Sequence, residues 1–383
     1  MQSQAIRGAR IFSGSEFLDQ HAIVVTEGRI ERICPDDRVE SGTPCLDLPG
    51  GTVAPGFIDL QVNGGGGVLF NNAPTFTSLG TMLKAHRHGG TTALLPTIIT
   101  DAQTVREQAL ESIQEAMDRG LDGVLGLHFE GPFLDTGRRG VHSETHVRPI
   151  DDDDVTWLES ISLCRVMLTL APEHVSPERI EKLSHAGVIV CAGHSAATLE
   201  QTNAAIAAGL RGFTHLFNAM SPLGSREPGM VGAALASADC WCGIIVDGHH
   251  VHPTNVLLAL RALPQGKLYL VSDSMATVGA EEKSFELYGE TIAEKDGHLV
   301  NQEGRLAGSA ISMIDAVRNT HKDVGVPLDE CLRMASLYPA ELIGDASQRG
   351  RIDAGYRADL VHFDEDFEVL NTWVVGEQHS HHA

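Results

Sequence analysis

With 383 residues, of which 42% are hydrophobic and 21% are charged, the chain is long enough for one large globular domain with a full core. Its formal net charge of −23, from 28 basic and 51 acidic side chains, repels nucleic acids and anionic membrane surfaces and excludes both as expected partners. Its 7 cysteines lack the spacing of a disulfide framework, and the chain has neither a signal-peptide core nor an apolar run of about 18 residues. We therefore expect a cytoplasmic protein.

Both ends of the chain show the pattern of short β-strands separated by turns. Neither residues 1–50 nor residues 351–383 are enough for a stable core alone, so we expect them to pack together as one small β-sandwich domain. The His-rich C-terminus, HSHHA, is expected to be disordered and is not expected to be a functional metal site. The expected strands are residues 5–12, 21–26, 29–34, 358–363 and 368–375.

Between these ends, residues 51–350 alternate strand patterns with helix patterns. Eight strands in this order and over this length predict an α/β fold of the (β/α)₈ barrel type, which takes about 250 residues. After the eighth strand, residues 285–300 read as an inserted hairpin. The expected barrel strands are residues 52–62, 91–99, 123–129, 164–170, 188–192, 212–216, 242–246 and 267–271.

Chemically active side chains stand where these strands end. His194 and His215 follow the fifth and sixth strands, Glu130 closes the third and Asp273 follows the eighth. In a parallel barrel the carboxyl ends of all strands lie on one face, so we expect these side chains to meet there. Taken alone, a buried His is more often a hydrogen-bonded core residue, Glu130 a structural acid and Asp273 a helix cap.

Their joint occurrence favours a hydrolytic metal site. Glu130, His194 and His215 are the ligand types of zinc and similar ions, and three protein ligands leave a coordination position for water, whose pKa the metal lowers toward ~7. Asp273, outside the ligand set, can then take and return the proton.

Six segments at these and neighbouring positions resemble one known family. They are residues 54–59 (APGFID), 130–132 (EGP), 192–195 (AGHS), 214–220 (THLFNAM), 226–229 (REPG) and 272–273 (SD). The sequence is similar, essentially from end to end, to the N-acetylglucosamine-6-phosphate deacetylase family of the metal-dependent amidohydrolase superfamily. HLFNAM and REPG are specific to that family, whereas PGFID marks only the superfamily.

The resemblance implies a metal site and two catalytic residues. Glu130, His194 and His215 would bind one divalent metal ion, with zinc as our first choice and iron, manganese or cobalt also suited to these ligands. Asp273 would be the general base and acid, and His142 would polarise the acetamide carbonyl. Many members of the superfamily have His-x-His after the first strand, where this chain has Gln-Val-Asn at residues 61–63. We also find no lysine at the end of the fourth strand, so we expect a single metal ion.

The resemblance further implies a binding site for a phosphorylated amino sugar. Arg226 and His250 would be the charged partners of the phosphate, with His250 reaching the neighbouring subunit's site in a homodimer. On so acidic a chain, Arg226 and the histidines 249 and 250 are also a local source of positive charge. The alternatives are an ion pair between Arg226 and Glu227, and a plain surface location for His142. The other implied contacts are Val141, His142, Asn218, Ala219, Leu306, Ala307 and Gly308.

The implied reaction hydrolyses the acetamide of N-acetyl-D-glucosamine 6-phosphate to D-glucosamine 6-phosphate and acetate, a step of amino-sugar catabolism. One alternative is a sister enzyme for N-acetylgalactosamine 6-phosphate, because epimer choice depends on one hydroxyl contact that a sequence does not place. The other is a non-catalytic sugar-phosphate sensor, which would have no need of Asp273.

Overall fold

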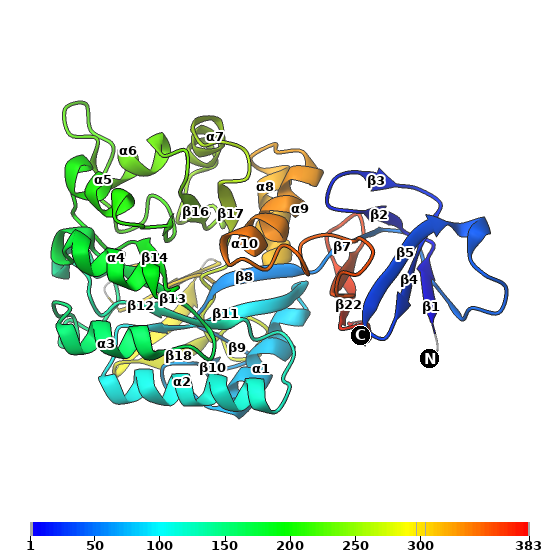
Figure 1. Ribbon diagram of the computed structural model, residues 1–383, viewed down its shortest axis with the longest axis horizontal. Coiled ribbons are helices and arrows are strands. Elements are labelled where there is room, and N and C mark those ends of the chain that lie inside the picture. Colours follow the sequence, from blue (N-terminus) through cyan, green and yellow to red (C-terminus); the bar gives the residue numbers. More distant parts are fainter. Residues whose placement is uncertain (1–2, 296, 303, 382–383) are drawn as a thin grey trace.

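A parallel barrel forms the larger part of the molecule (Figure 1). The computed structural model describes residues 3–381 except 296 and 303. Eight parallel strands follow one another around the barrel, and hydrogen bonds from Asp273 N to Gln61 O (3.0 Å) and from Asn63 N to Ser274 O (2.9 Å) close it. The predicted (β/α)₈ fold is therefore confirmed. The strands are β8 (Phe57–Val62), β11 (Thr91–Ile99), β12 (Gly126–Glu130), β13 (Arg165–Leu170), β14 (Ile189–Ala192), β15 (Gly212–Phe213), β16 (Trp241–Ile244) and β17 (Leu268–Leu270).

Helices cover the outside of this sheet (Figure 1). Apolar residues of the helices α1 to α10 join those of the strands in one continuous core. None of the helices in the described residues is both long and apolar enough to span a membrane. The helices are α1 (Phe76–Arg87), α2 (Gln103–Asp118), α3 (Asp152–Ser160), α4 (Pro177–His185), α5 (Leu199–Ala207), α6 (Gly229–Ala236), α7 (Pro253–Ala262), α8 (Met313–Lys322), α9 (Leu328–Ala335) and α10 (Leu337–Leu342).

Both chain ends meet in a smaller β unit beside the barrel (Figure 1). A four-stranded sheet, in the order β5-β4-β1-β6, faces a six-stranded sheet, in the order β23-β22-β21-β7-β2-β3. Ile23 of the first sheet and Trp373 of the second lie in one apolar core. The strands are β1 (Gln4–Arg7), β2 (Arg10–Phe12), β3 (Phe17–Leu18), β4 (His21–Thr26), β5 (Arg29–Pro35), β6 (Cys45–Asp47), β7 (Thr52–Pro55), β21 (Leu360–Phe363), β22 (Val369–Val374) and β23 (Glu377–Ser380).

Three expectations about this unit need correction. The expected strand 5–12 is two strands in different sheets, because Gly8 has a φ of +92° and turns the chain between them. The expected strand 52–62 is divided at Gly56, so that β7 belongs to the sheet that joins the chain ends. The C-terminal tail is not disordered as far as His381, because β23 pairs with β22; residues 382 and 383 lie outside the described residues. The domain boundaries at 50 and 351 stay predictions.

The expected hairpin after the barrel is a three-stranded antiparallel sheet, which we call the insert. Its apolar residues Leu287, Ile292 and Leu299 pack with Ile99 and Met275, at the carboxyl ends of the barrel strands. The insert therefore lies over the face where the active residues were expected. Its strands are β18 (Ser284–Leu287), β19 (Glu290–Lys295) and β20 (His298–Val300), and a short pair, β9 (Gly64–Gly65) and β10 (Val68–Leu69), follows β8.

Candidate active site

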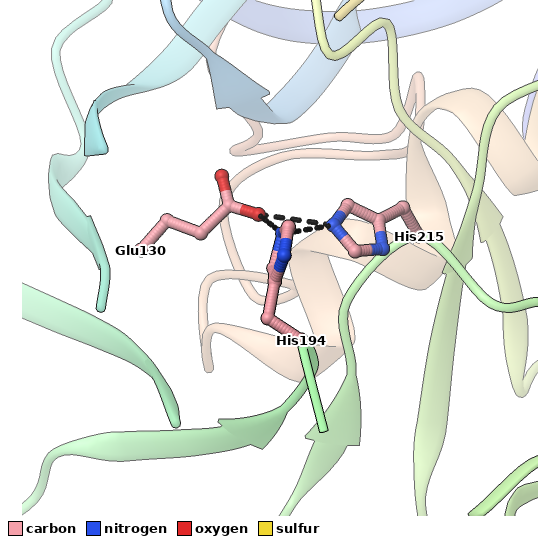
Figure 2. Close-up of side chains that lie close together, drawn as sticks. All are labelled: Glu130, His194 and His215. Carbon is pink, nitrogen blue, oxygen red and sulfur yellow. Dashed lines mark hydrogen bonds and ion pairs between the residues drawn. The ribbon is translucent and has the colours of Figure 1, made fainter. Parts of the chain in front are cut away.

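Glu130, His194 and His215 converge at the carboxyl ends of their strands (Figure 2). Glu130 is the last residue of β12, and the two histidines follow β14 and β15 by two residues each. Glu130 Oε1 lies 2.9 Å from His194 Nε2 and 3.0 Å from His215 Nε2, and the two nitrogens are 3.0 Å apart. The predicted meeting of these three side chains is confirmed, and they could hold a metal ion.

The donor chemistry of this cluster fits a cation. His194 Nδ1 donates to the carbonyl oxygen of Arg138 at 2.9 Å, which leaves the lone pair of the neutral ring on Nε2, facing the cluster. A carboxylate oxygen and two imidazole nitrogens about 3 Å apart repel one another unless a proton or a metal ion lies among them. Burial raises the pKa of Glu130, but the imidazole rings of His194 and His215 beside it outweigh that effect and hold the pKa well below its usual value.

The backbone is strained where it carries these groups. His194, His215 and Asp273 have φ values of +49°, +36° and +52°, in the left-handed region that residues with a side chain rarely adopt. Such conformations cost about 1–3 kcal/mol each and persist where the surrounding structure enforces them, which is common in active sites. At each position the chain turns sharply out of a barrel strand, and this turn presents the side chain to the barrel mouth.

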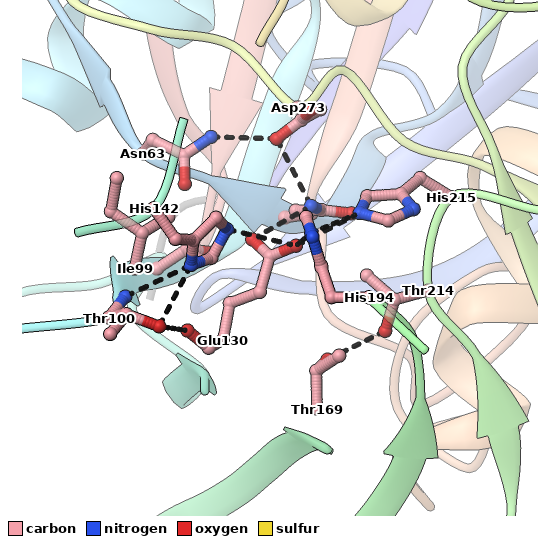
Figure 3. A network of polar contacts seen from close by, with 12 residues as sticks. Asn63, Ile99, Thr100, Glu130, His142, Thr169, His194, Thr214, His215 and Asp273 are labelled. Atoms are coloured by element: carbon pink, nitrogen blue, oxygen red, sulfur yellow. Dashed lines mark hydrogen bonds and ion pairs between the residues drawn. The ribbon is translucent and has the colours of Figure 1, made fainter. Parts of the chain in front are cut away.

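Asp273 lies beside the cluster and is held by two amide side chains; Figure 3 shows one of them, Asn63. Its Oδ1 accepts hydrogen bonds from Asn63 Nδ2 at 2.7 Å and Gln61 Nε2 at 3.0 Å. Gln61 Nε2 also lies 3.2 Å from Glu130 Oε2, so one amide spans the cluster and the acid. Burial, and then the charge of Glu130, raise the pKa of Asp273 to about 6. From the sequence, Gln61 and Asn63 were noted only as replacements of two metal-binding histidines. Because the first and eighth strands are neighbours in a closed barrel, both residues lie within reach of Asp273.

His142 points into the site from the loop after β12 (Figure 3). The backbone N–H of Thr100 donates to its Nδ1 at 3.2 Å, and Thr100 Oγ1 lies 2.9 Å from the same nitrogen. Burial, and then the charge of His194, lower the pKa of His142 to about 3. His142 is thus a neutral ring with its proton on Nε2, 3.9 Å from Glu130 Oε1. It is 5% exposed, which excludes the plain surface location.

Asp59 supports the site from inside the barrel. This buried carboxylate accepts hydrogen bonds from the hydroxyl and backbone N–H of Ser272 and from the backbone N–H of Gln61. It therefore joins β8 to the segment that carries Asp273. Burial raises its pKa to about 7. Its role in positioning Asp273 was not foreseen from the APGFID segment.

A cavity of about 190 Å³ opens onto the cluster and Asp273. Ala307 is fully buried and packs with the insert, so it lies behind the wall. Of the residues implied as substrate contacts, those in the wall are Val141, His142, Asn218, Ala219, His250, Leu306 and Gly308.

The two proposed phosphate partners lie in different places. His250 lines the cavity of its own chain, where its Nδ1 lies 2.6 Å from Asp247 Oδ2. Burial raises the pKa of Asp247, but the hydrogen bond with His250 and the charge of His250 outweigh burial and hold that pKa at about 2. The prediction that His250 reaches a neighbouring subunit's site stays a prediction. Sequence reasoning also did not foresee the role of Asp247 as the partner of His250.

Arg226, in contrast, is exposed on the loop between β15 and α6 and does not line the cavity. The expected alternative, an ion pair with Glu227, is also not present among the described residues. Glu227 Oε1 instead accepts hydrogen bonds from the backbone N–H groups of Leu199 (2.8 Å) and Gly229 (3.0 Å).

Comparison with known proteins places this site in a family. Residues 52–378 match the amidohydrolase family and residues 5–53 match the NagA composite domain. The chain is 42% identical to the N-acetylgalactosamine-6-phosphate deacetylase of Shewanella sp. (strain ANA-3), over 97% of this chain and 94% of that protein.

Two solved structures share the whole architecture. The N-acetylglucosamine-6-phosphate deacetylase of Pasteurella multocida superposes with a TM-score of 0.96 at 38% identity, over 99% of this chain and 100% of that chain. A mutant of the Mycobacterium smegmatis N-acetyl-D-glucosamine-6-phosphate deacetylase, in complex with N-acetyl-D-glucosamine-6-phosphate, gives 0.88 at 29% identity over 98% of both chains. This chain therefore belongs to the amidohydrolase family, in the branch that contains the N-acetylglucosamine-6-phosphate and N-acetylgalactosamine-6-phosphate deacetylases.

Proposed function

We propose that this protein hydrolyses the acetamide of N-acetyl-D-glucosamine 6-phosphate to acetate and D-glucosamine 6-phosphate. The observation that carries the proposal is the position of Asp273, which lies outside the cluster of Glu130, His194 and His215 but is held beside it by Gln61 and Asn63. A protein that only binds a sugar phosphate has no need of a buried proton acceptor at this point. Amino-sugar catabolism in the cytoplasm is part of the proposal.

The proposed cofactor is one divalent ion, with zinc as the first choice, held by Glu130, His194 and His215. When bound, such an ion supplies Lewis acidity, which lowers the pKa of coordinated water and polarises a carbonyl. A single ion is supported by Gln61 and Asn63. Both direct N–H groups at Asp273, and an N–H donor does not coordinate a cation.

The side chains divide the proton chemistry between them. His142 Nε2–H donates to the acetamide oxygen and stabilises the negative charge that forms there as water adds to the carbonyl carbon. Asp273 accepts the proton that this water loses. It then returns the proton to the sugar nitrogen as the C–N bond breaks, so that the amine and acetate leave and Asp273 is again ionised.

We further propose a homodimer that shares its phosphate sites. His250, Asn218 and Ala219 would bind the phosphate from within their own chain, since all three line its cavity. Arg226 lies outside that cavity, on an exposed loop beside Leu223, which is 61% exposed. This loop would carry Arg226 to the phosphate in the cavity of the partner subunit.

The test is an acetate-release assay on metal-free protein titrated with zinc, with both epimers as substrates. We expect turnover of the glucosamine epimer that reaches its maximum near one equivalent of zinc per chain. A maximum only near two equivalents would contradict the single ion. Tight binding of the sugar phosphate without acetate release would favour the sensor instead.

The galactosamine epimer is a second candidate, because the Shewanella relative at 42% identity is an N-acetylgalactosamine-6-phosphate deacetylase. The two epimers differ in the orientation of one hydroxyl, which a single hydrogen bond can distinguish. A higher kcat/KM for N-acetylgalactosamine 6-phosphate would replace our first choice of substrate and leave the mechanism unchanged.

A further inference from the structure

Tyr288 occupies a position in the insert that is unfavourable for its side chain. It is the first of the two residues that connect β18 to β19, and Leu287 pairs with Glu290 across the turn. Tyr288 and Gly289 have φ values of +52° and +82°. Two-residue turns with positive φ at both positions favour Asn-Gly or Gly-Gly, and a bulky residue there is strained. A strained residue of this kind is a reason to look for a function of its side chain.

The phenol of Tyr288 is hydrogen-bonded to the barrel mouth. Its O–H donates to the carbonyl oxygen of Thr100, the residue after β11. Tyr288 also lines one cavity together with His142 and Ser143, which lie on the loop after β12. One side chain of the insert therefore reaches two parts of the barrel mouth.

Thr100 is also the residue that holds His142. Its backbone N–H donates to His142 Nδ1 at 3.2 Å, and its Oγ1 lies 2.9 Å from the same nitrogen. That hydrogen bond places the ring proton on Nε2, on the side of the cavity (Figure 3). A displacement of Thr100 would turn the Nε2–H of His142 away from the substrate.

The hydroxyl is not needed to attach the insert to the barrel. Leu287, Ile292 and Leu299 already bury an apolar face against Ile99 and Met275. Tyr288 itself is 39% exposed, so its ring contributes less to that packing than a core residue does. The apolar packing therefore does not account for the hydrogen bond of the phenol to Thr100, the residue that in turn is bonded to His142.

We propose that Tyr288 is a positioning residue for His142: it holds Thr100, the hydrogen-bond partner of His142 Nδ1, in place so that Nε2–H points at the acetamide oxygen. The proposal rests on the deacetylase function proposed above. It assigns to the insert a part in the reaction, in addition to covering the cavity.

The test compares two variants of the insert that each lose one hydroxyl. Tyr288→Phe should lower kcat by about two- to tenfold, the effect of one lost hydrogen bond on an oriented group, and should leave KM within about twofold. Thr291→Val is the matched control, because the Thr291 hydroxyl bonds to Glu286 within the insert and not to the active site. It should leave both constants unchanged. An unchanged kcat in Tyr288→Phe would overturn the proposal.

A double variant separates positioning from general loosening of the fold. His142→Ala removes the group through which Tyr288 acts, so adding Tyr288→Phe to His142→Ala should lower kcat no further. A full additional loss would mean that Tyr288 acts elsewhere, and would also overturn the proposal.

A spectroscopic measurement keeps the inference independent of the substrate. In ¹⁵N spectra of the histidine rings, the His142 signals are assigned by their loss in His142→Ala. They should shift in Tyr288→Phe and stay in place in Thr291→Val. If the wild-type protein released no acetate, the proposed function would fail while this measurement still decided whether Tyr288 sets the environment of His142. Unshifted signals would count against the positioning role.

Discussion

The barrel mouth and the small β unit are built in opposite ways. At the mouth, buried ionisable groups crowd together, among them Glu130, His142 and Asp273, and the backbone is strained at His194 and His215. The core between the two sheets of the small unit is apolar, with fully buried Ile23 and Trp373 at its centre. Each buried ionisable group and each left-handed residue costs stability, whereas each buried apolar side chain adds to it.

The difference teaches where the chain gives up stability for chemistry. The buried ionisable groups and strained residues of the mouth lower the stability of the fold, but they hold the reactive groups at the distances that hydrolysis requires. The apolar core around the mouth offsets this loss of stability. Substitutions at the mouth should therefore change activity more than stability. Substitutions in the small unit should do the reverse.

The largest effect is expected at Asp273. Asp273→Asn keeps the shape of the side chain but cannot accept a proton. Proton transfer contributes ~10² to 10⁴-fold per step, and in the proposed mechanism Asp273 serves two steps, so kcat should fall by several orders of magnitude. Steady-state kinetics measure this loss.

Metal content and melting temperature of Asp273→Asn are the controls. Since Asp273 is not one of the three proposed ligands, the variant should bind the same amount of metal as wild type. In the metal-free protein its melting temperature should not be lowered, because the charge that is removed lies buried near that of Glu130. Loss of the metal would identify Asp273 as a ligand and weaken the contrast between the two regions.

The reverse behaviour is expected of Ile23→Ala in the small unit. Ile23 is fully buried between the sheets, and truncation of such a side chain lowers the free energy of unfolding by about 2–5 kcal/mol. Denaturant unfolding should show this loss, while kcat at a temperature where the protein stays folded should match wild type. A large fall in kcat would mean that the small unit shapes the active site.

An intermediate effect is expected at the two proposed phosphate partners. Truncation of a charged partner of a buried ion typically costs about 2–5 kcal/mol, so Arg226→Ala and His250→Ala should each raise KM at least about tenfold and change kcat much less. The phosphate lies away from the bond that breaks, which is why the effect should be on binding.

Subunit mixing then distinguishes the two residues. Mixed with Asp273→Asn, Arg226→Ala subunits should regain activity at low substrate concentration, because a hybrid dimer has one site with Asp273 and a partner's intact loop. His250→Ala subunits should not, since His250 lines its own cavity. Recovery with His250→Ala, or none with Arg226→Ala after verified exchange, would reverse this assignment.

The smallest effect is expected at Glu27. The turn Glu27-Gly28 between β4 and β5 has φ values of +52° and +73°, like the Tyr288-Gly289 turn of the insert, but Glu27 is exposed and far from the mouth in the fold. Asn tolerates this conformation better, so Glu27→Asn should raise the free energy of unfolding by up to about 1 kcal/mol. Activity should not change; a change would show that such strain also matters in the small unit.

The sequence predicted much of the barrel mouth for a general reason. Alternating strand and helix patterns imply a parallel barrel, and in a parallel barrel the strand ends lie on one face whatever their separation in the chain. Glu130, His194, His215 and Asp273 could therefore be assigned to one site before any distance was known. The short sequence motifs around these residues then implied the family.

Other contacts could not be predicted from the sequence, because they depend on the directions of side chains from segments that are distant in the chain. Gln61 and Asn63 were recognised as non-ligands, but only the closed barrel brings their N–H groups to Asp273. The strand expected at residues 5–12 is split because Gly8 turns the chain, a choice of φ that a β-like pattern does not reveal.

By itself, the sequence determined the barrel, the ends of its strands and the group of residues gathered there, since these follow from local periodicity and from the geometry of parallel strands. Only the tertiary structure decided that His250 lines its own cavity, that Arg226 stays outside it and that Tyr288 contacts Thr100. Those placements depend on turns of the backbone, such as those with positive φ at Gly248 and Tyr288, and on the docking of the insert, neither of which a local pattern reveals.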